Sequence, residues 1–382
     1  MMNSSGSTNS PFLNILEYLK NMLHNDTVTE NELLNYFYGP FNDLASPKTP
    51  QRDQIILYTA PIVYVVGVFG HLMSFLILPY FAKKESSYVY LLFLSIFDLL
   101  VLNVGLLIRW LHEILGVNIL SFNDCTCKML TFLGLLFSDT SVWLLVAVTM
   151  ERFIILYHPF RATLICTVRR SLMIIFFLVI IIALVNIHVF WTLEIVVDNV
   201  TRQKNCDSTV DSNALIYQAW PLIDSLIYSI LPFLSTCVLN YKIIQKIRHI
   251  KSRNRNVYSR RFSRGTSDQK IPKVEKKLTI TMVILSVTFM VTTLPMLIYL
   301  CVTALLNSLA KQPIFSHQRY RYFRSFAELM MYCNHAINFY LYIANSRRLR
   351  LWFRKRVFRQ KAEKLVTGNQ VLEKQEYSSR FS

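Results

Sequence analysis

Several polar side chains stand inside long apolar stretches of the sequence, where they are costly to keep. Asp98 lies within the apolar run 88–112. A charged side chain at the centre of a membrane-spanning helix costs about 2.5–3.5 kcal/mol on the insertion scale. Asn334, Asn338 and Tyr342 recur at four-residue spacing, so they share one helix face. Groups of this kind are usually retained because they serve a function inside the helix bundle.

A second polar group lies at the end of another apolar run. Glu151, Arg152 and Phe153 close the run 128–156, and Ser141 precedes Arg152 by eleven residues, about three helical turns, on the same face. The side chains named so far include acids, amides, a hydroxyl and a cation. They form no nucleophile–base pair and no cluster with metal-ligand spacing, so the sequence does not predict an enzyme.

Seven apolar blocks must position these residues. Each has at least the ~20 residues that a helix needs to cross ~30 Å of hydrocarbon. The blocks cover 55–79, 88–112, 128–156, 171–194, 215–242, 278–306 and 322–344. Backbone polar groups in lipid must be bonded within their own segment, and the alternation of a β-barrel is absent. The sequence therefore predicts an all-α membrane protein, a bundle of seven transmembrane helices.

Lysine and arginine are unevenly distributed over the segments between these blocks. They total 29 in one set of segments: 80–87, 158–170, 241–278 and 345–382. They total 8 in the other set: 1–54, 113–126, 195–214 and 307–321. The positive-inside rule places the first set in the cytoplasm, and hence the N-terminus outside and the C-terminus inside. This asymmetry accounts for the formal net charge of +18, so no nucleic-acid partner is expected.

The chain divides into three regions on this basis. Residues 1–54 form an extracellular segment in which we expect no cleaved signal peptide, 55–344 the transmembrane domain, and 345–382 a cytoplasmic tail. The tail begins with a predicted amphipathic surface helix over 346–359. Glycosylation sequons begin at three positions assigned to the outside: Asn3, Asn25 and Asn199.

Two cysteines at the start of the third block compete for one partner. Cys206 follows the fourth block on the predicted outer side, where the compartment is oxidising. Cys125 and Cys127 lie at the matching end of the third block. Either can form a disulfide with Cys206, so the residues alone leave the pairing open.

The ordered motifs resemble those of the rhodopsin-like (class A) G-protein-coupled receptors. Glu151-Arg152-Phe153 is similar to the Asp-Arg-Tyr motif of that family, and residues 338–342 are similar to its Asn-Pro-x-x-Tyr motif. Cys127 stands 25 residues before Arg152, the family spacing for the disulfide cysteine. Prolines match the helix-bending positions of the family at Pro232 and Pro295. The resemblance covers about residues 55–358.

This resemblance implies roles for the motif residues. It favours a Cys127–Cys206 disulfide, and it implies that Glu151 holds Arg152 until activation frees the guanidinium toward a G protein. The implied G-protein coupling residues are Glu151, Arg152, Phe153, Pro159, Phe160, Asn338 and Tyr342. Arrestin is a further implied partner. The family also suggests a Na⁺ site, for which oxygen ligands come from Asp98, Ser141, Asn334 and Asn338. A hydrogen-bond network with water is the alternative, and no other cofactor is expected.

The sequence departs from the family at the positions of its usual switch residues. His71 stands where an Asn is usual, and it can bond toward Asp98. Thr293 stands in place of the aromatic residue of the sixth helix, and Phe339 replaces the proline of the seventh. The detailed roles of the family's switch residues in activation therefore cannot be carried over to this sequence.

The predicted pocket suits a peptide. Gly134 occupies the position at which amine receptors of the family carry an Asp, and 322–344 contain no Lys for an opsin Schiff base. Aromatic residues with a few charges remain as candidate ligand contacts: Arg109, Trp191, Glu194, Tyr299, Glu328 and Tyr332. Alternatively, Arg109 and Glu328 only neutralise each other.

The overall pattern is similar to invertebrate neuropeptide receptors of the FMRFamide and myosuppressin type. It implies a multi-pass plasma-membrane receptor that binds a neuropeptide and activates a heterotrimeric G protein. The alternative is a chemosensory receptor of the same fold for a small molecule.

Overall fold

A computed structural model describes residues 53–197, 204–212, 219–260, 273–310, 318–346 and 348–354. The first predicted span corresponds to α3 (Gln54–Ala82), and the third corresponds to α6 (Asp124–Tyr157). The second span consists of α4 (Ser86–Val101), the π-helical turns of η2 (Leu102–Leu107) and α5 (Ile108–Leu115). A short 3-10 turn, η3 (Ile119–Ser121), precedes α6, and α7 (Pro159–Ile165) follows it.

The later spans are also helical. They comprise α8 (Val168–Asn186) with α9 (Val189–Thr192), α10 (Trp220–Asp224) with η6 (Ser225–Ile230) and α11 (Leu231–Arg260), α12 (Lys273–Ala310), and α13 (Gln318–Asn345). Six helices in the described part of the chain are long and apolar enough to cross a membrane. The seventh, α13, has 28 residues, a sufficient length, but carries Arg321, Arg324 and Glu328 near its start.

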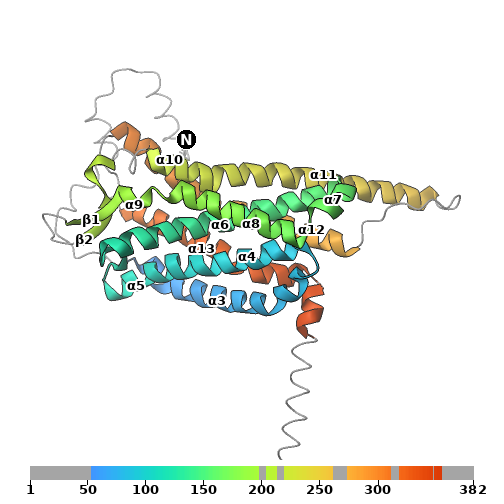
Figure 1. Cartoon of the computed structure of the whole chain (residues 1–382), viewed down its shortest axis with the longest axis horizontal. Helices are drawn as coiled ribbons and strands as arrows, with labels where there is room; N and C mark the ends of the chain where they lie inside the picture. Colours follow the sequence, from blue (N-terminus) through green and yellow to red (C-terminus); the bar gives the residue numbers. More distant parts are fainter. Residues whose placement is uncertain are drawn as a thin grey trace, which may run out of the picture. The chain divides into compact units, whose positions relative to one another are not determined.

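The long helices lie side by side in Figure 1. α13 packs against α3 and α12, and α4 packs against α3 and α6. Large side chains fill the shared core, among them Phe81, Tyr88, Leu144, Phe289 and Tyr342. Apolar side chains of α8 are instead exposed, including Phe176, Phe177, Ile181 and Leu184. An apolar outer face of this kind is expected where a helix borders lipid.

A β-hairpin follows α9, and the all-α prediction did not include it. β1 (Leu193–Val197) pairs antiparallel with β2 (Lys204–Ser208), and Ile195 lies opposite Cys206. The predicted helix 171–194 therefore ends early, because Leu193 and Glu194 belong to the strand. The β-branched run from Ile195 to Val197 favours an extended chain. A last short turn, η4 (Val210–Ser212), follows β2.

Local capping fixes where three helices begin. The Asp53 side chain accepts hydrogen bonds from the backbone N–H groups of Ile55 and Ile56 at the start of α3. Asn123 and Thr126 form a reciprocal capping box at the start of α6. Pro159 is the first residue of α7, where its missing N–H costs nothing. These caps position the residues of the site described next.

Candidate functional site

The polar residues predicted from the sequence are distributed along the helices in three places. We call the end that holds Cys127 and the β-hairpin the hairpin end, and the end that holds Arg152 and α7 the α7 end. The third place lies between them, around Asp98. Among the described residues, no group of three or more His, Cys, Asp or Glu side chains is arranged to hold a metal ion.

Asp98 is fully buried and accepts hydrogen bonds from two other helices. The Ser141 hydroxyl on α6 donates to its Oδ1 over 2.5 Å. The Asn338 amide on α13 donates to its Oδ2 over 2.6 Å. A third partner is His335, whose Nδ1 lies 2.8 Å from Oδ1. The structure thus brings together three of the four predicted ion ligands and adds a histidine.

The fourth predicted ligand, Asn334, takes no part in these contacts to Asp98, although it is buried beside His335 on α13. His71 also makes a different bond from the one expected. Its Nε2 donates to the backbone carbonyl oxygen of His335 over 2.9 Å, rather than bonding to Asp98. His71 therefore fastens α3 to α13 at the residue that completes the Asp98 network.

Glu151, at the α7 end, is held by two serines at the start of α4. Ser86 donates to one carboxylate oxygen of Glu151, and Ser87 donates to the other over 2.5 Å. The three residues are between 1% and 7% exposed. Arg152, the next residue on α6, is also buried. The Glu151 carboxylate thus joins α6 to α4 directly beside the arginine.

The other predicted coupling residues lie in different places: Phe153, Pro159 and Phe160 at the α7 end, and Asn338 among the partners of Asp98. Phe153 stacks on Tyr157 with ring centroids 4.5 Å apart. Pro159 opens α7, and the Phe160 side chain is 77% exposed. Tyr342 is buried in the core. Cys166 follows α7, and burial, with a smaller contribution from the Glu151 carboxylate, raises the pKa of its thiol to about 11.

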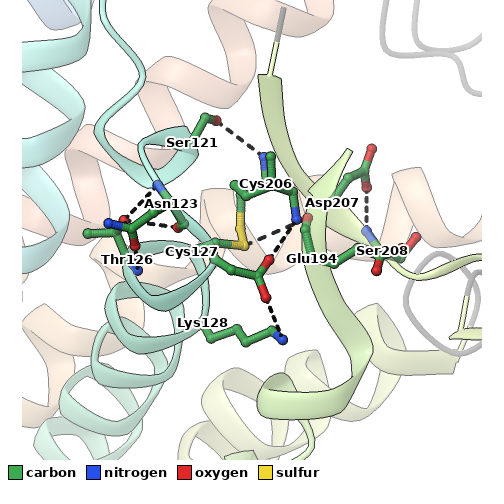
Figure 2. The surroundings of a disulfide bond; sticks show 11 residues. Ser121, Asn123, Thr126, Cys127, Lys128, Glu194, Cys206, Asp207 and Ser208 are labelled. Carbon is green, nitrogen blue, oxygen red and sulfur yellow. Dashed lines mark hydrogen bonds and ion pairs between the residues drawn. A yellow bond between two sulfur atoms is a disulfide. The ribbon is translucent and has the colours of Figure 1, made fainter. Parts of the chain in front are cut away.

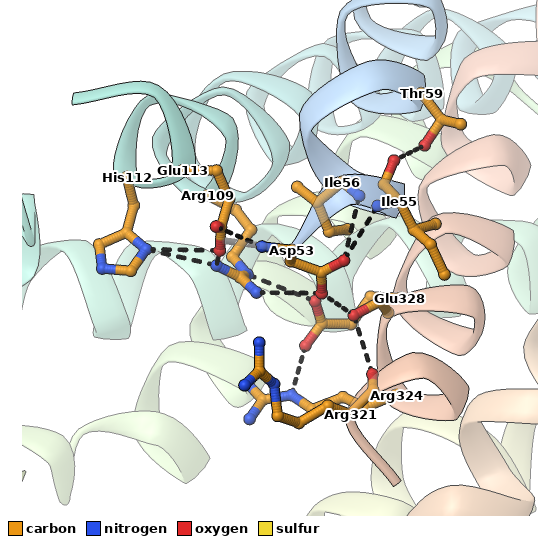
Figure 3. A network of polar contacts seen from close by, with 11 residues as sticks. Asp53, Ile55, Ile56, Thr59, Arg109, His112, Glu113, Arg321, Arg324 and Glu328 are labelled. Carbon is orange, nitrogen blue, oxygen red and sulfur yellow. Dashed lines mark hydrogen bonds and ion pairs between the residues drawn. The ribbon is translucent and has the colours of Figure 1, made fainter. Parts of the chain in front are cut away.

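At the hairpin end, Arg109 of α5 lies among three carboxylates (Figure 3). It forms an ion pair with Glu113 one turn later on its own helix. Its Nη2 lies 3.8 Å from Oδ2 of Asp53, the N-cap residue of α3, and its Nε lies 3.6 Å from Glu328 Oε2 on α13. Arg109 therefore joins three helices, and its predicted neighbour Glu328 is indeed beside it.

Each carboxylate of this cluster has further partners. Glu328 also accepts from Arg324 Nε over 2.7 Å. Asp53 accepts from the Ser325 hydroxyl, and its own backbone N–H donates to Glu113 over 2.9 Å. The cluster of Asp53, Arg109, Glu113, Arg324 and Glu328 thus contains three acids and two arginines. Much of its charge is neutralised internally, as the alternative interpretation of Arg109 and Glu328 expected.

The predicted aromatic contacts are placed on neighbouring helices. Tyr332 lies one turn after Glu328 on α13, and its hydroxyl occupies the space beside Gly105 of η2. A Cβ atom on residue 105 would lie 2.7 Å from the Tyr332 hydroxyl oxygen. Tyr299 of α12 is buried, with its ring centroid 6.4 Å from that of Phe323. Gly105 is thus required for the position of Tyr332.

Trp191 and Glu194 belong to a different part of the hairpin end. Trp191 lies on α9 and is 60% exposed, and Glu194 lies on β1, opposite Asp207. Glu194 adjoins the disulfide, which joins Cys127 to Cys206 with their Cα atoms 5.4 Å apart (Figure 2). Cys125 is a free, exposed cysteine.

The disulfide is supported by two polar contacts around it. The Ser121 hydroxyl accepts from the backbone N–H of Cys206 over 3.2 Å, and Asp124 accepts from the N–H of Ile195 over 3.0 Å. These contacts attach the hairpin to η3 through β2 and to the start of α6 through β1. The three sequons fall outside the described residues.

Sequence reasoning missed several residues of these sites. Asp53 was detectable, because an Asp directly before an apolar run is a helix N-cap signal. The pair Ser86 and Ser87 also begins an apolar run, although their bonding to Glu151 depends on how two helices pack. His335 had no local signal that distinguished it from Asn334.

The sequence is similar to those of known receptors. The family described as 7 transmembrane receptor (rhodopsin family) matches residues 72–342. The thyrotropin-releasing hormone receptor of Mus musculus is 25% identical over 323 residues, 77% of this chain and 76% of the relative. Neuromedin-U receptor 2 of Homo sapiens is 32% identical over 32% of this chain and 30% of its own. An FMRFamide peptide receptor of Caenorhabditis elegans is 27% identical over 32% of this chain and 29% of its own.

The matched region contains the Asp98 network, the Glu151–Arg152 pair, the disulfide and most of the Arg109 cluster. It extends to Tyr342, and so includes α13, the helix whose charges lower its hydropathy. The match is to a family of receptors rather than enzymes. The chain therefore belongs to the rhodopsin family of seven-transmembrane receptors.

Proposed function

We propose that this chain is a plasma-membrane receptor that binds an extracellular neuropeptide and activates a heterotrimeric G protein. The observation that carries the proposal is its similarity, over about three quarters of its length, to a hormone receptor of the rhodopsin family. Shorter similarities to neuromedin-U and FMRFamide peptide receptors support the same ligand class. They do not favour a chemosensory receptor for a small molecule.

The peptide binds at the hairpin end in this proposal. The Arg109 cluster offers charges of both signs, and Tyr299 and Tyr332 lie on helices beside it. A carboxylate of the peptide can take the place of Glu328 beside an arginine of the cluster. A basic side chain of the peptide can take the place of Arg324 beside Glu328. Together these exchanges leave no buried charge unpaired. The exposed Trp191 and the strand residue Glu194 provide a second set of contacts on the hairpin.

The G protein binds at the α7 end. Arg152 is placed to receive it because the guanidinium remains charged and can change partners, while Glu151 stays held by Ser86 and Ser87. Pro159 and the exposed Phe160 provide contacts on α7, and Phe153, Asn338 and Tyr342 act from the adjoining helices. Arrestin is a further partner for the same end of the receptor.

The orientation places the hairpin end outside the cell. The excess of lysine and arginine in the segments of the α7 end supports it. So do the sequons at Asn3, Asn25 and Asn199, which we expect to be glycosylated. Residues 348–354 are helical, with Leu349 buried and Trp352 beside Tyr80 of α3. We assign them to an amphipathic helix on the inner surface of the bilayer.

A peptide screen tests this function. Cells that express the receptor with a promiscuous G protein are exposed to a panel of neuropeptides, and intracellular calcium is recorded. At least one peptide should evoke a response that untransfected cells lack. The Arg152→Ala variant should bind the labelled peptide but give no calcium response, because the group that engages the G protein is gone.

Two results would contradict the proposal. One is a response to small volatile compounds without a response to any peptide of the panel. The other is full signalling by the Arg152→Ala variant, which would remove Arg152 from the mechanism.

A further inference from the structure

The family suggests a Na⁺ site at Asp98, but the side chains around this carboxylate do not fit one. Sodium binds to oxygen atoms. Asp98 instead accepts hydrogen bonds from three side chains, and two of the donor groups are N–H groups, those of Asn338 and His335. A carboxylate can only accept hydrogen bonds, so the nitrogen atoms that face Asp98 are donors. A nitrogen atom that donates a hydrogen bond cannot at the same time be a ligand of a metal ion.

The imidazole of His335 lies where the ion would have to bind. Its Nδ1 is 2.8 Å from Asp98 Oδ1 and 3.4 Å from Ser141 Oγ. These are the two oxygen atoms that a cation would share. An N–H group and an ion cannot occupy the same position between them. The Ser141 hydroxyl, in addition, is already directed at Asp98 over 2.5 Å.

Contacts between α13 and α3 hold His335 in position. His71 donates to the His335 backbone carbonyl over 2.9 Å, and both histidines are fully buried. The next residue, Ala336, packs so closely on α3 that a Cβ atom at Gly67 would lie 3.0 Å from the Ala336 Cβ. Close packing and a buried hydrogen bond therefore resist any rotation of α13 that would withdraw the imidazole from Asp98.

We propose that the imidazole N–H of His335 takes the place of Na⁺ at Asp98 and closes this site to the ion. The receptor then completes its central polar network with a side chain of α13. Its folded state gains nothing from Na⁺ beyond the general effect of salt. Exclusion of Na⁺ by His335 is a property of the transmembrane core alone and does not depend on the ligand or on the G protein.

The test is the thermal unfolding of the full-length receptor, purified in detergent, in NaCl and in choline chloride at equal ionic strength. The wild type should have the same Tm in both salts. His335→Ser removes the imidazole and supplies a small oxygen ligand. Its Tm should be higher in NaCl by about 2–4 °C, the shift expected for an ion bound only to the folded state at moderate affinity.

Two controls separate ion binding from general effects of mutation. His188→Ser removes another buried histidine, whose Nδ1 bonds to the Val185 carbonyl rather than to Asp98, so its Tm should not distinguish the salts. Adding Asp98→Asn to His335→Ser should abolish the Na⁺ effect, because the charged ligand is lost.

A Na⁺-specific rise in the Tm of the wild type would overturn the proposal. So would a His335→Ser variant that remains indifferent to Na⁺, because His335 would then not be what excludes the ion. If that variant does not fold, His335→Asn offers the same comparison, and the wild-type measurement still decides independently. A failed peptide screen would leave these results unaffected.

Discussion

Two buried carboxylates, Asp98 and Glu151, join the same pair of helices at two depths. Asp98 of α4 accepts from Ser141 of α6, and Glu151 of α6 accepts from serines of α4. Ser87 and Asp98 are eleven residues apart, about 16 Å along a helix. The two antiparallel helices thus exchange hydroxyl-to-carboxylate bonds, and each bond satisfies a charge that lipid would not solvate.

Removing the serine pair should destabilise the receptor. Ser86→Ala with Ser87→Ala leaves the Glu151 carboxylate buried without two of its donors. A hydrogen bond to a charged group contributes about 1.5–3 kcal/mol, so the Tm in detergent should fall by several degrees. Thr163→Ala, which removes an exposed hydroxyl of α7, should leave the Tm unchanged. Equal Tm values for both variants would show that the Glu151 contacts contribute little.

Cys166 should react slowly with maleimides at neutral pH. Its pKa of about 11, raised chiefly by burial, leaves almost no thiolate at pH 7. The alkylation rate should therefore rise about tenfold per pH unit from pH 7 toward pH 10 in the folded receptor. A Cys166→Ser variant supplies the background from other thiols. A rate that levels off near pH 8.5, the ordinary thiol value, would contradict the assigned shift.

The β-hairpin is fixed to η3 and α6 by one covalent bond and a few hydrogen bonds. The Cys127–Cys206 disulfide spans 79 residues of sequence, so it restricts a long loop. Ser121 and Asp124 add contacts to the two strands. The hairpin carries Glu194 and follows directly after Trp191. Its attachment therefore determines where one set of proposed peptide contacts lies.

Loss of this disulfide should reduce both stability and peptide binding. Cys206→Ser should lower the free energy of unfolding by about 2–4 kcal/mol, the usual contribution of a disulfide that closes a long loop. Binding of the peptide identified by the screen should weaken at least tenfold. Cys125→Ser is a matched control, because Cys125 is free and only two residues from Cys127. If both variants bind alike, the hairpin does not position the ligand.

The Arg109 cluster holds the starts of α3 and α13 to α5. Arg109→Ala leaves three carboxylates, those of Asp53, Glu113 and Glu328, without a shared cation. The loss of one partner of a buried ion pair costs about 3–5 kcal/mol, and we expect the lower end because Arg109 is 28% exposed. Chemical unfolding in detergent measures it. Lys128→Ala disrupts only the exposed pair with Asp124 and should cost less than about 1 kcal/mol.

The orientation of the chain in the membrane sets the proposed peptide site and the proposed G-protein site on opposite sides of the bilayer. The two lie at opposite ends of α6, the helix that contains Cys127 and Arg152. With 34 residues, α6 extends for about 51 Å, enough to cross the bilayer completely. A peptide at one end and a G protein at the other therefore never touch, and the signal must pass through helix packing.

Glycosidase and antibody access should establish this orientation. Treatment of intact cells with an N-glycosidase should increase the mobility of the receptor on a gel. Replacing Asn3, Asn25 and Asn199 by Gln should remove that shift. An antibody to a tag after Ser382 should bind only permeabilised cells, and a tag before Met1 should be accessible without permeabilisation. The reverse pattern would invert the assigned topology.

The seven helices were predictable from the sequence, since their length and hydropathy are local properties of the chain. The first helix was predicted to begin at residue 55 and begins at Gln54, and the sixth was predicted at 278–306 and spans Lys273–Ala310. The β-hairpin was missed for two reasons. Its pairing joins two strands that are separated by six residues, so no local pattern reveals it. The apolar run of the fourth block also continues into β1, so it was read as helix up to residue 194. The sequence left two alternatives for Arg109 and Glu328, contact with a peptide or mutual neutralisation, and the structure places the two side chains beside each other.

From the amino-acid sequence alone, this chain is predicted to be a seven-helix membrane receptor with an arginine at the end of its third helix. The residue that completes the Asp98 network, in contrast, depends on how the helices pack in three dimensions. Asn334 and His335 are adjacent on α13, and consecutive residues point about 100° apart around a helix. The rotation of α13 is set by its packing on α3, where Gly67 meets Ala336 and His71 binds the His335 carbonyl. That rotation turns a histidine, rather than a second asparagine, toward Asp98.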